Sequence, residues 1–204
     1  MRSFVHEAAQ FIEMDVRDPK LLSVFEDFKP SIVFHEAAQT IVQSSMENPG
    51  YDCDVNLLGL INVLEACRQV KVEQFLMPSS AAVYGDLAVL PLTEELSGMP
   101  SSFYGLTKLT AEGYLCIYRE AFGLNTVCFR YANVYGPRQG DGGEGGVISI
   151  FNRLIVEGKP LTVYGDGEQT RDFIYVDDVV EANIKAMGNS TCTGIYNVST
   201  NTGT

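Results

Sequence analysis

Apolar residues follow two alternating patterns along most of this chain. Short runs such as Ser31–Phe34 are typical of buried strands, whereas apolar residues recurring every three or four positions are typical of amphipathic helices. The predicted strands cover residues 11–16, 31–34, 74–77, 125–130, 161–164 and 195–198. The predicted helices cover residues 19–29, 51–70, 104–122, 147–157 and 176–187.

Strands and helices alternate throughout, which predicts an α/β protein with a doubly wound parallel sheet and helices on both faces. Ligands of such sheets bind beyond the carboxyl ends of the strands. Polar groups follow several of the predicted strands: Asp15, residues 35–40, Ser79, Ser80 and Asn133. We therefore expect one site, assembled from several loops at that edge of the sheet.

The charge and the cysteines narrow the class of protein. A net charge of −12 argues against binding nucleic acid, because phosphate recognition needs a basic face. No apolar run approaches the ~20 residues of a membrane span, and residues 1–4 show no signal-peptide core. The five cysteines are an odd number and form no CxxC pair, which favours free thiols in the cytoplasm. No metal site is expected.

Tyr104 and Lys108 are the first candidates for chemistry. Their four-residue spacing places them on one face of the predicted helix. A nearby ammonium favours a phenolate and lowers the pKa of the tyrosine, whose ordinary value is near ~10. Ser79 and Ser80 follow a strand and could share a proton with that phenol. Taken separately, the pair could be an ordinary amphipathic helix, and the serines a turn or a helix cap.

Two further segments change this picture. They are RYANVYGPRQ at 130–139 and GDGEQTRDFIYVDDV at 165–179. Together with PSSAAVYG at 78–85 and the YxxxK pair, they resemble the extended short-chain dehydrogenase/reductase family, the NAD-dependent epimerases and dehydratases. The resemblance covers residues 11–203 and is closest to the nucleotide-sugar 4-epimerases.

The resemblance implies a role for particular residues. It implies a catalytic triad of Ser80, Tyr104 and Lys108. For NAD it implies contacts from Tyr104 and Lys108 and from Asp15, Val16, Ala37, Ala38, Gln39, Asn56 and Ala132. Asp15 and Val16 would flank the adenine, Asn56 would order the site from a helix at the dimer interface, and Ala132 replaces an aromatic residue usual beside the nicotinamide.

The substrate side follows from the same resemblance. It implies contacts to a nucleotide sugar from Ser80, Tyr104, Asn133, Val147, Val163, Tyr164 and Arg171. Arg171 matches a diphosphate-binding arginine, and its forked guanidinium suits phosphate oxygens. The alternative for Arg171 is a surface ion pair with Asp172.

The serine loop indicates which reaction to expect. Dehydratases of this family carry an acid there, whereas this chain has Ser80-Ala81, as in a 4-epimerase. The implied function is a nucleotide-sugar 4-epimerase of the UDP-glucose/UDP-galactose type, a homodimer that transiently oxidises C4 with NAD. The alternatives are another nucleotide-sugar enzyme of the family, such as a uronate epimerase or a reductase, or an inactive fragment that binds ligand or self-associates.

One part of the family pattern is missing from this sequence. The family's glycine-rich loop does not occur before the first predicted strand, and Gly140–Gly146 precedes no dinucleotide-binding unit. We expect a Rossmann-like domain at 1–134 that lacks its first βαβ unit, and part of a small substrate-binding lobe at 135–204 with a return segment to the sheet. The pentapeptide His-Glu-Ala-Ala-Gln also occurs twice, at 6–10 and at 35–39.

Overall fold

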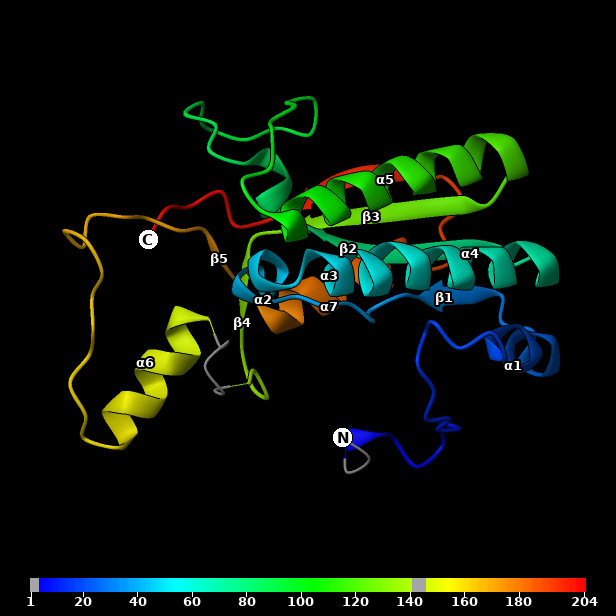
Figure 1. The fold of residues 1–204 in the computed structure, drawn as a ribbon, viewed down its shortest axis with the longest axis horizontal. Helices are drawn as coiled ribbons and strands as arrows, with labels where there is room; N and C mark the ends of the chain where they lie inside the picture. The colour runs from blue at the N-terminus through cyan, green and yellow to red at the C-terminus, as the bar shows by residue number, and fades with distance from the viewer. Residues whose placement is uncertain (1–3, 141–145) are drawn as a thin grey trace.

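The structure is a computed structural model that describes residues 4–140 and 146–204. Its centre is a sheet of four parallel strands in the order β1-β2-β3-β6 (Figure 1). These strands are β1 (Ile32–Phe34), β2 (Gln74–Ser80), β3 (Asn125–Tyr131) and β6 (Gly194–Val198). A second, two-stranded parallel sheet is formed by β4 (Asn133–Tyr135) and β5 (Phe173–Tyr175).

Helices cover both faces of the main sheet. The helices are α1 (Leu21–Phe28), α2 (Val42–Glu47), α3 (Pro49–Cys53), α4 (Gly59–Val70), α5 (Phe103–Phe122), α6 (Val147–Val156) and α7 (Val176–Ala186). Alternate residues of β2 point to opposite cores: Phe75 and Met77 pack with α4 and α5, and Leu76 packs with Ala186 of α7. Both faces of the strand are apolar because both are covered, which confirms the predicted doubly wound α/β architecture.

Most predicted elements are confirmed within a few residues, but the long helix predicted at 51–70 is interrupted. Between α3 and α4 the chain makes one π-helical turn, η2 (Asp54–Leu58). A π turn widens the helix locally, and such turns are frequent at functional sites. A short 3₁₀ turn, η3 (Ala81–Tyr84), follows β2. The sequence pattern did not predict α2, β4 or β5.

The strands predicted at 11–16 and 161–164 are wrong. Residues 11–16 run as an irregular segment, held to α4 by the Asn62 side chain, which donates to the carbonyls of Val16 (2.7 Å) and Asp18 (3.0 Å). Residues 161–164 are also irregular and lie in the long exposed connection between α6 and β5 (Figure 1). Alternation of apolar residues makes a strand only where a neighbouring strand accepts the hydrogen bonds.

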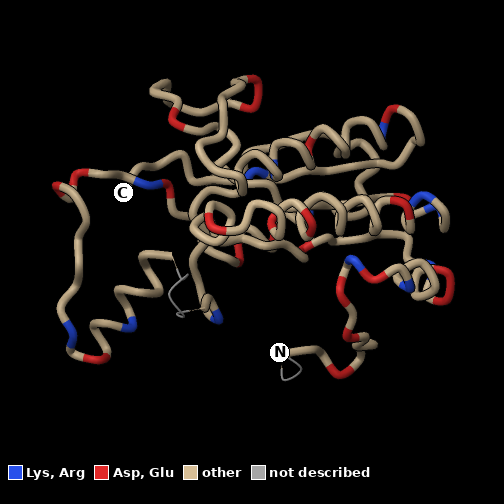
Figure 2. Tube along the Cα trace, viewed as in Figure 1, with Lys and Arg blue, Asp and Glu red and all other residues tan. Residues whose placement is uncertain are grey.

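Acidic side chains outnumber basic ones, but neither kind is confined to one region of the chain (Figure 2). Figure 2 shows Asp and Glu on helices and loops around the whole view, with fewer and scattered Lys and Arg. Within the described residues, no helix is both long and apolar enough to cross a bilayer.

Candidate active site

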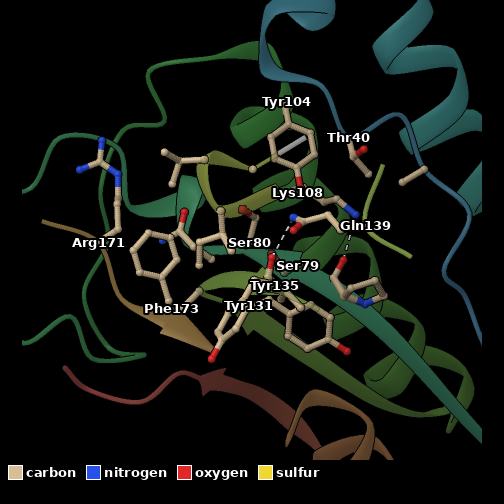
Figure 3. Close-up of a pocket in the computed structure, with 18 of the residues that line it drawn as sticks. Thr40, Ser79, Ser80, Tyr104, Lys108, Tyr131, Tyr135, Gln139, Arg171 and Phe173 are labelled. Carbon is tan, nitrogen blue, oxygen red and sulfur yellow. Dashed lines mark hydrogen bonds between the residues drawn. The ribbon is translucent and has the colours of Figure 1, made fainter. Parts of the chain in front are cut away.

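A cavity of about 600 Å³ opens at the carboxyl ends of β1, β2 and β3 (Figure 3). This is the edge where the sequence predicted a site assembled from several loops. The predicted residues among those that line it are Ala38, Ser80, Tyr104, Lys108, Ala132, Asn133, Val147 and Arg171.

Ser80 is the last residue of β2, paired in register with Tyr131 of β3. Its hydroxyl accepts a hydrogen bond from the amide of Ala82 (3.2 Å), which begins the 3₁₀ turn η3. The neighbouring Ser79 side chain points to the opposite side of the strand and donates to Glu112 (2.5 Å). The Ser79 hydroxyl is thus bound to Glu112, whereas the Ser80 hydroxyl is held at the start of η3.

The start of α5 places Tyr104 and Lys108 in the same cavity. The Ser102 side chain caps the helix by accepting from the amide of Gly105 (3.1 Å). A side chain at Gly105 would put its Cβ 2.6 Å from the carbonyl oxygen of Ala82. Glycine at this position thus lets α5 pack closely against η3, so that Tyr104 and Ser80 meet (Figure 3).

The pKa of Tyr104 differs in direction from the expectation based on Lys108. Burial raises this pKa above its usual value of 10, although a hydrogen bond with Ser80 lowers it. The Lys108 Nζ lies 5.9 Å from the centre of the Tyr104 ring and donates to the carbonyl of Pro78 (2.9 Å). Burial also lowers the pKa of Lys108. In the chain alone, desolvation and the charge of Asp52 outweigh the interaction with Ser80 that favours a phenolate.

Gln39 and Asn56 lie together behind the cavity and are both buried. The Gln39 amide donates to Asn56 Oδ1 (2.8 Å), and Asn56 Nδ2 donates to the Gln39 carbonyl (3.0 Å). This pair ties the loop after β1 to the π turn η2. The loop residue Ala38 lines the cavity, whereas Ala37 is exposed.

Asp15 and Val16 are not brought to the cavity. Arg17 holds the Asp15 carboxylate with two donors, at 2.9 and 2.7 Å, and also binds Asp54 (2.6 Å). These hydrogen bonds from Arg17 lower the pKa of Asp15 to about 2. Asp15 thus has a partner within the chain, and the structure leaves its predicted adenine contact untested.

The substrate-side residues fall into two groups. Asn133, Val147 and Arg171 line the cavity, and Figure 3 shows Arg171 standing apart from Tyr104. Val163 and Tyr164 are 58% and 80% exposed, and neither lines this cavity.

The alternative partner of Arg171, Asp172, is occupied elsewhere. Its Oδ1 accepts from the amide of Thr200 (3.0 Å) and from the Thr200 hydroxyl (2.8 Å). Arg171 itself donates to the carbonyl of Thr170 (2.8 Å). The described residues therefore do not form the surface ion pair that was the alternative for Arg171.

Several residues of the cavity wall were not predicted. They are Pro78, Tyr131, Val134, Tyr135, Gln139, Gly146, Ile148 and Phe173, whereas Glu36, Thr40 and Ser79 also line the cavity and belong to the polar groups expected at this edge. Tyr131 and Tyr135 belong to the segment RYANVYGP. Alternate residues of a strand share a face, so this segment could have predicted that the two tyrosines point to the same side. Glu36 brings a carboxylate close to Lys108, and burial raises the pKa of that carboxylate while Lys108 lowers it.

The model of the NAD dependent epimerase/dehydratase family matches residues 2–199. A protein of Methanocaldococcus jannaschii named putative UDP-glucose 4-epimerase is 42% identical over 90% of this chain and 60% of its own length. The UDP-glucose 4-epimerase of Mycolicibacterium smegmatis is 38% identical over 94% of this chain and 61% of its own. The chain thus spans about three fifths of the length of these relatives.

Solved structures of UDP-glucose 4-epimerases are also similar to this chain. UDP-glucose 4-epimerase of Thermotoga maritima with UDP-glucose superposes with a TM-score of 0.93 and 37% identity, over 98% of this chain and 65% of that one. The Thermus thermophilus UDP-glucose 4-epimerase complex with NAD superposes with a TM-score of 0.92 and 40% identity, over 100% of this chain and 68% of that one.

Proposed function

Because the chain belongs to the NAD dependent epimerase/dehydratase family, we propose that it forms the catalytic part of a nucleotide-sugar 4-epimerase. The proposed substrates are UDP-hexoses of the UDP-glucose/UDP-galactose type. The observation that carries the proposal is the meeting of Ser80, Tyr104 and Lys108 in one cavity at the carboxyl edge of a parallel sheet.

The cavity fits the nicotinamide end of NAD. Ala38 and Ala132 have small side chains and leave room beside Tyr104 and Lys108, and the hydrogen bonds between Gln39 and Asn56 order the loop below. We propose that these residues hold the nicotinamide ribose, with Ala37 near it and Asp15 and Val16 toward the adenine. NAD, when bound, accepts a hydride from the sugar and returns it.

Tyr104 is proposed to take the proton of the sugar 4-hydroxyl and to give it back. Its raised pKa keeps the phenol protonated in the chain alone, so loss of the proton needs a positive charge close by. Lys108 is the cation that α5 supplies on the same helical face. The Ser80 side chain lies close enough to Tyr104 to lower the pKa of the phenol and can hold the sugar hydroxyl between them.

The substrate is proposed to extend from Tyr104 toward Asn133, Val147 and Arg171, with Arg171 binding the diphosphate. Val163 and Tyr164 are proposed to contact the base, and the exposed connection that carries them would have to fold over it. In this proposal residues 1–134 form the partial cofactor-binding domain, which also carries Ser80, Tyr104 and Asn133. Residues 135–204 form part of the substrate-binding lobe, with a return segment that adds β6 to the main sheet.

A uronate epimerase is the second candidate function. A UDP-glucuronate 4-epimerase of Thermodesulfobacterium geofontis is 34% identical over 89% of this chain. The structure of the Bacillus cereus UDP-glucuronic acid 4-epimerase, in complex with UDP-glucuronic acid and NAD, superposes with a TM-score of 0.87. Both candidates use the same proposed triad and differ in the sugar.

We further propose a homodimer in the cytoplasm. Leu58, Leu106 and Ile117 lie on η2 and α5 and are 56%, 44% and 61% exposed, which is unusual for large apolar side chains on neighbouring helices. All five cysteines are free thiols, as suits a reducing compartment.

The test is turnover of UDP-glucose and UDP-glucuronate by this chain, and by a chimera in which it replaces the matching region of the Methanocaldococcus jannaschii relative. Tyr104→Phe is expected to lower turnover by ~10²–10⁴-fold or more, because it removes the group that takes the proton. Ser80→Ala should lower turnover much less, since Tyr104 can still reach the sugar hydroxyl. Lys108→Met should move the onset of activity to higher pH.

Two results would contradict the proposal. One is a Tyr104→Phe variant that stays within a few-fold of its parent. The other is a parent chimera that folds but converts neither sugar nucleotide.

A further inference from the structure

Asp52 is a fully buried carboxylate that the proposed chemistry does not use. It lies in α3, is 0% exposed, and has only uncharged hydrogen-bonding side chains as partners among the residues that the structure describes. A buried charge without a direct counter-ion is costly, by several kcal/mol in typical proteins. Such a residue is therefore worth explaining.

Three donors from three different elements converge on this carboxylate. Gln39 Nε2 donates to Oδ1 at 2.7 Å, Asn56 Nδ2 donates to Oδ1 at 3.2 Å, and Thr107 Oγ1 donates to Oδ2 at 2.7 Å. Both oxygens act as acceptors, as an ionised carboxylate does. The donors come from the loop after β1, from the π turn η2 and from the first turn of α5.

Thr107 gives the cluster its link to the proposed chemistry. It is the residue before Lys108 and lies three after Tyr104, and its hydroxyl, whose single proton goes to Asp52, also lies 3.0 Å from the Tyr104 carbonyl oxygen. Asn56 Nδ2 makes a further contact with Thr107 Oγ1 (3.3 Å). The carboxylate therefore holds the turn that carries both proposed catalytic residues against the loop and η2.

We propose that Asp52 is a positioning residue, whose buried carboxylate fixes the Tyr104–Lys108 turn of α5 and places a negative charge beside it. This inference rests on the proposed function for the role of Tyr104.

The electrostatics of the two neighbours agree with this geometry. Burial is the main cause that raises the pKa of Tyr104, and the charge of Asp52 raises it further. Burial lowers the pKa of Lys108, whereas the charges of Glu36 and Asp52 raise it. Asp52 thus favours a protonated phenol together with a charged ammonium in the chain alone, so Tyr104 needs a nearby cation to lose its proton before it can act as the base.

The other ionisable groups near this cluster are accounted for. His35, Glu36 and Cys128 interact with Lys108 from the sheet side. On η2, Asp54 is 45% exposed and paired with Arg17. On α2, the exposed Glu47 accepts from Gln43 (2.7 Å). Asp54 therefore offers a matched control, because it is an aspartate two residues from Asp52 on the surface.

The test follows the ionisation of Tyr104 directly and needs no turnover. The chain is labelled with [¹³Cζ]tyrosine, the ¹³C resonances of its 10 tyrosines are followed against pH, and Tyr104 is assigned by its absence from Tyr104→Phe. The ionisation midpoint of Tyr104 is expected to fall in Asp52→Asn, because a charge that opposes the phenolate is removed. It is expected to stay at the parent value in Asp54→Asn.

A midpoint that is unchanged or raised in Asp52→Asn overturns the proposal, as does an equal fall in Asp54→Asn. If Asp52→Asn does not fold, Thr107→Val takes its place, since it keeps the charge and removes one of its three donors. With one donor fewer to offset the Asp52 charge, the ionisation midpoint of Tyr104 should then rise. An unchanged midpoint overturns the proposal. A failure of the epimerase assay leaves this titration unaffected, so the two proposals fail separately.

Discussion

At the scale of single residues, burial controls the ionisation of the site more strongly than the neighbouring charges do. His35 follows β1, is 7% exposed and stacks on Phe75 with ring centres 5.7 Å apart. Burial, with a smaller contribution from Lys108, lowers the pKa of His35 from 6.5 to about 4. The folded chain therefore keeps this imidazole neutral at pH values where the unfolded chain protonates it.

The neutral state of His35 makes the stability of the folded chain depend on pH over a defined range. Between pH 6.5 and about 4 the unfolded state binds the extra proton, so stability falls as the pH falls through this range. The loss for one group is on the order of 3 kcal/mol. His35→Gln has no such titration. Urea unfolding at pH 7.5 and pH 4.5 should show the parent losing more stability than His35→Gln, and an equal loss would contradict the prediction.

At the scale of elements, a buried ion pair joins α5 to β3. Arg130 donates to both oxygens of Glu112, at 2.7 and 3.0 Å, and the two side chains are 6% and 3% exposed. Arg130 also donates to the Tyr84 hydroxyl (2.9 Å), and Ser79 donates to Glu112. The pair thus joins the helix of Tyr104 to the strand and turn of Ser80.

Removing one partner of this pair is expected to be costly. Glu112→Gln leaves the Arg130 charge buried without its counter-ion, which typically costs ~3–5 kcal/mol. Replacing both, as Glu112→Leu with Arg130→Met, should cost much less, because no charge is then left unpaired. Glu120→Gln on the exposed side of α5 is the control. Urea denaturation measures all four proteins, and a Glu112→Gln loss no larger than that of Glu120→Gln would sink the prediction.

At the scale of the whole molecule, α4 and α5 lie side by side on one face of the sheet (Figure 1). The apolar residues that α5 and η2 leave exposed suggest that a second copy covers this face. Leu58→Lys with Ile117→Lys should convert the proposed dimer to a monomer, because burying two ammonium groups per chain is unfavourable. Val156→Lys, on α6 and 85% exposed, is the control. Sedimentation velocity measures the result, and a parent that is already monomeric would contradict the prediction.

The sequence by itself determined the elements whose cause is local. The cap at Ser102, the glycine at 105 and the spacing of Tyr104 and Lys108 lie within a few residues, so the start of α5 and its two proposed catalytic groups could be predicted. The apolar runs of β2 and β3 likewise predicted strands buried on both faces. The resemblance of four ordered motifs then placed Ser80 opposite Tyr104.

Only the tertiary structure decided what depends on a distant neighbour. Residues 11–16 alternate like a strand but pair with no strand among the described residues, and the Val16 carbonyl at their end accepts from Asn62 instead. The pentapeptide His-Glu-Ala-Ala-Gln is exposed at 6–10, whereas at 35–39 it buries His35 and Gln39 because β1 leads it under α5. The sequence pattern alone would place Asp52 on the exposed side of a helix. Hydrogen bonds from Gln39 and Thr107, 13 and 55 residues away, instead make it the centre of a buried cluster. Hydrogen bonds of this kind depend on the packing of separate elements, which no local pattern records.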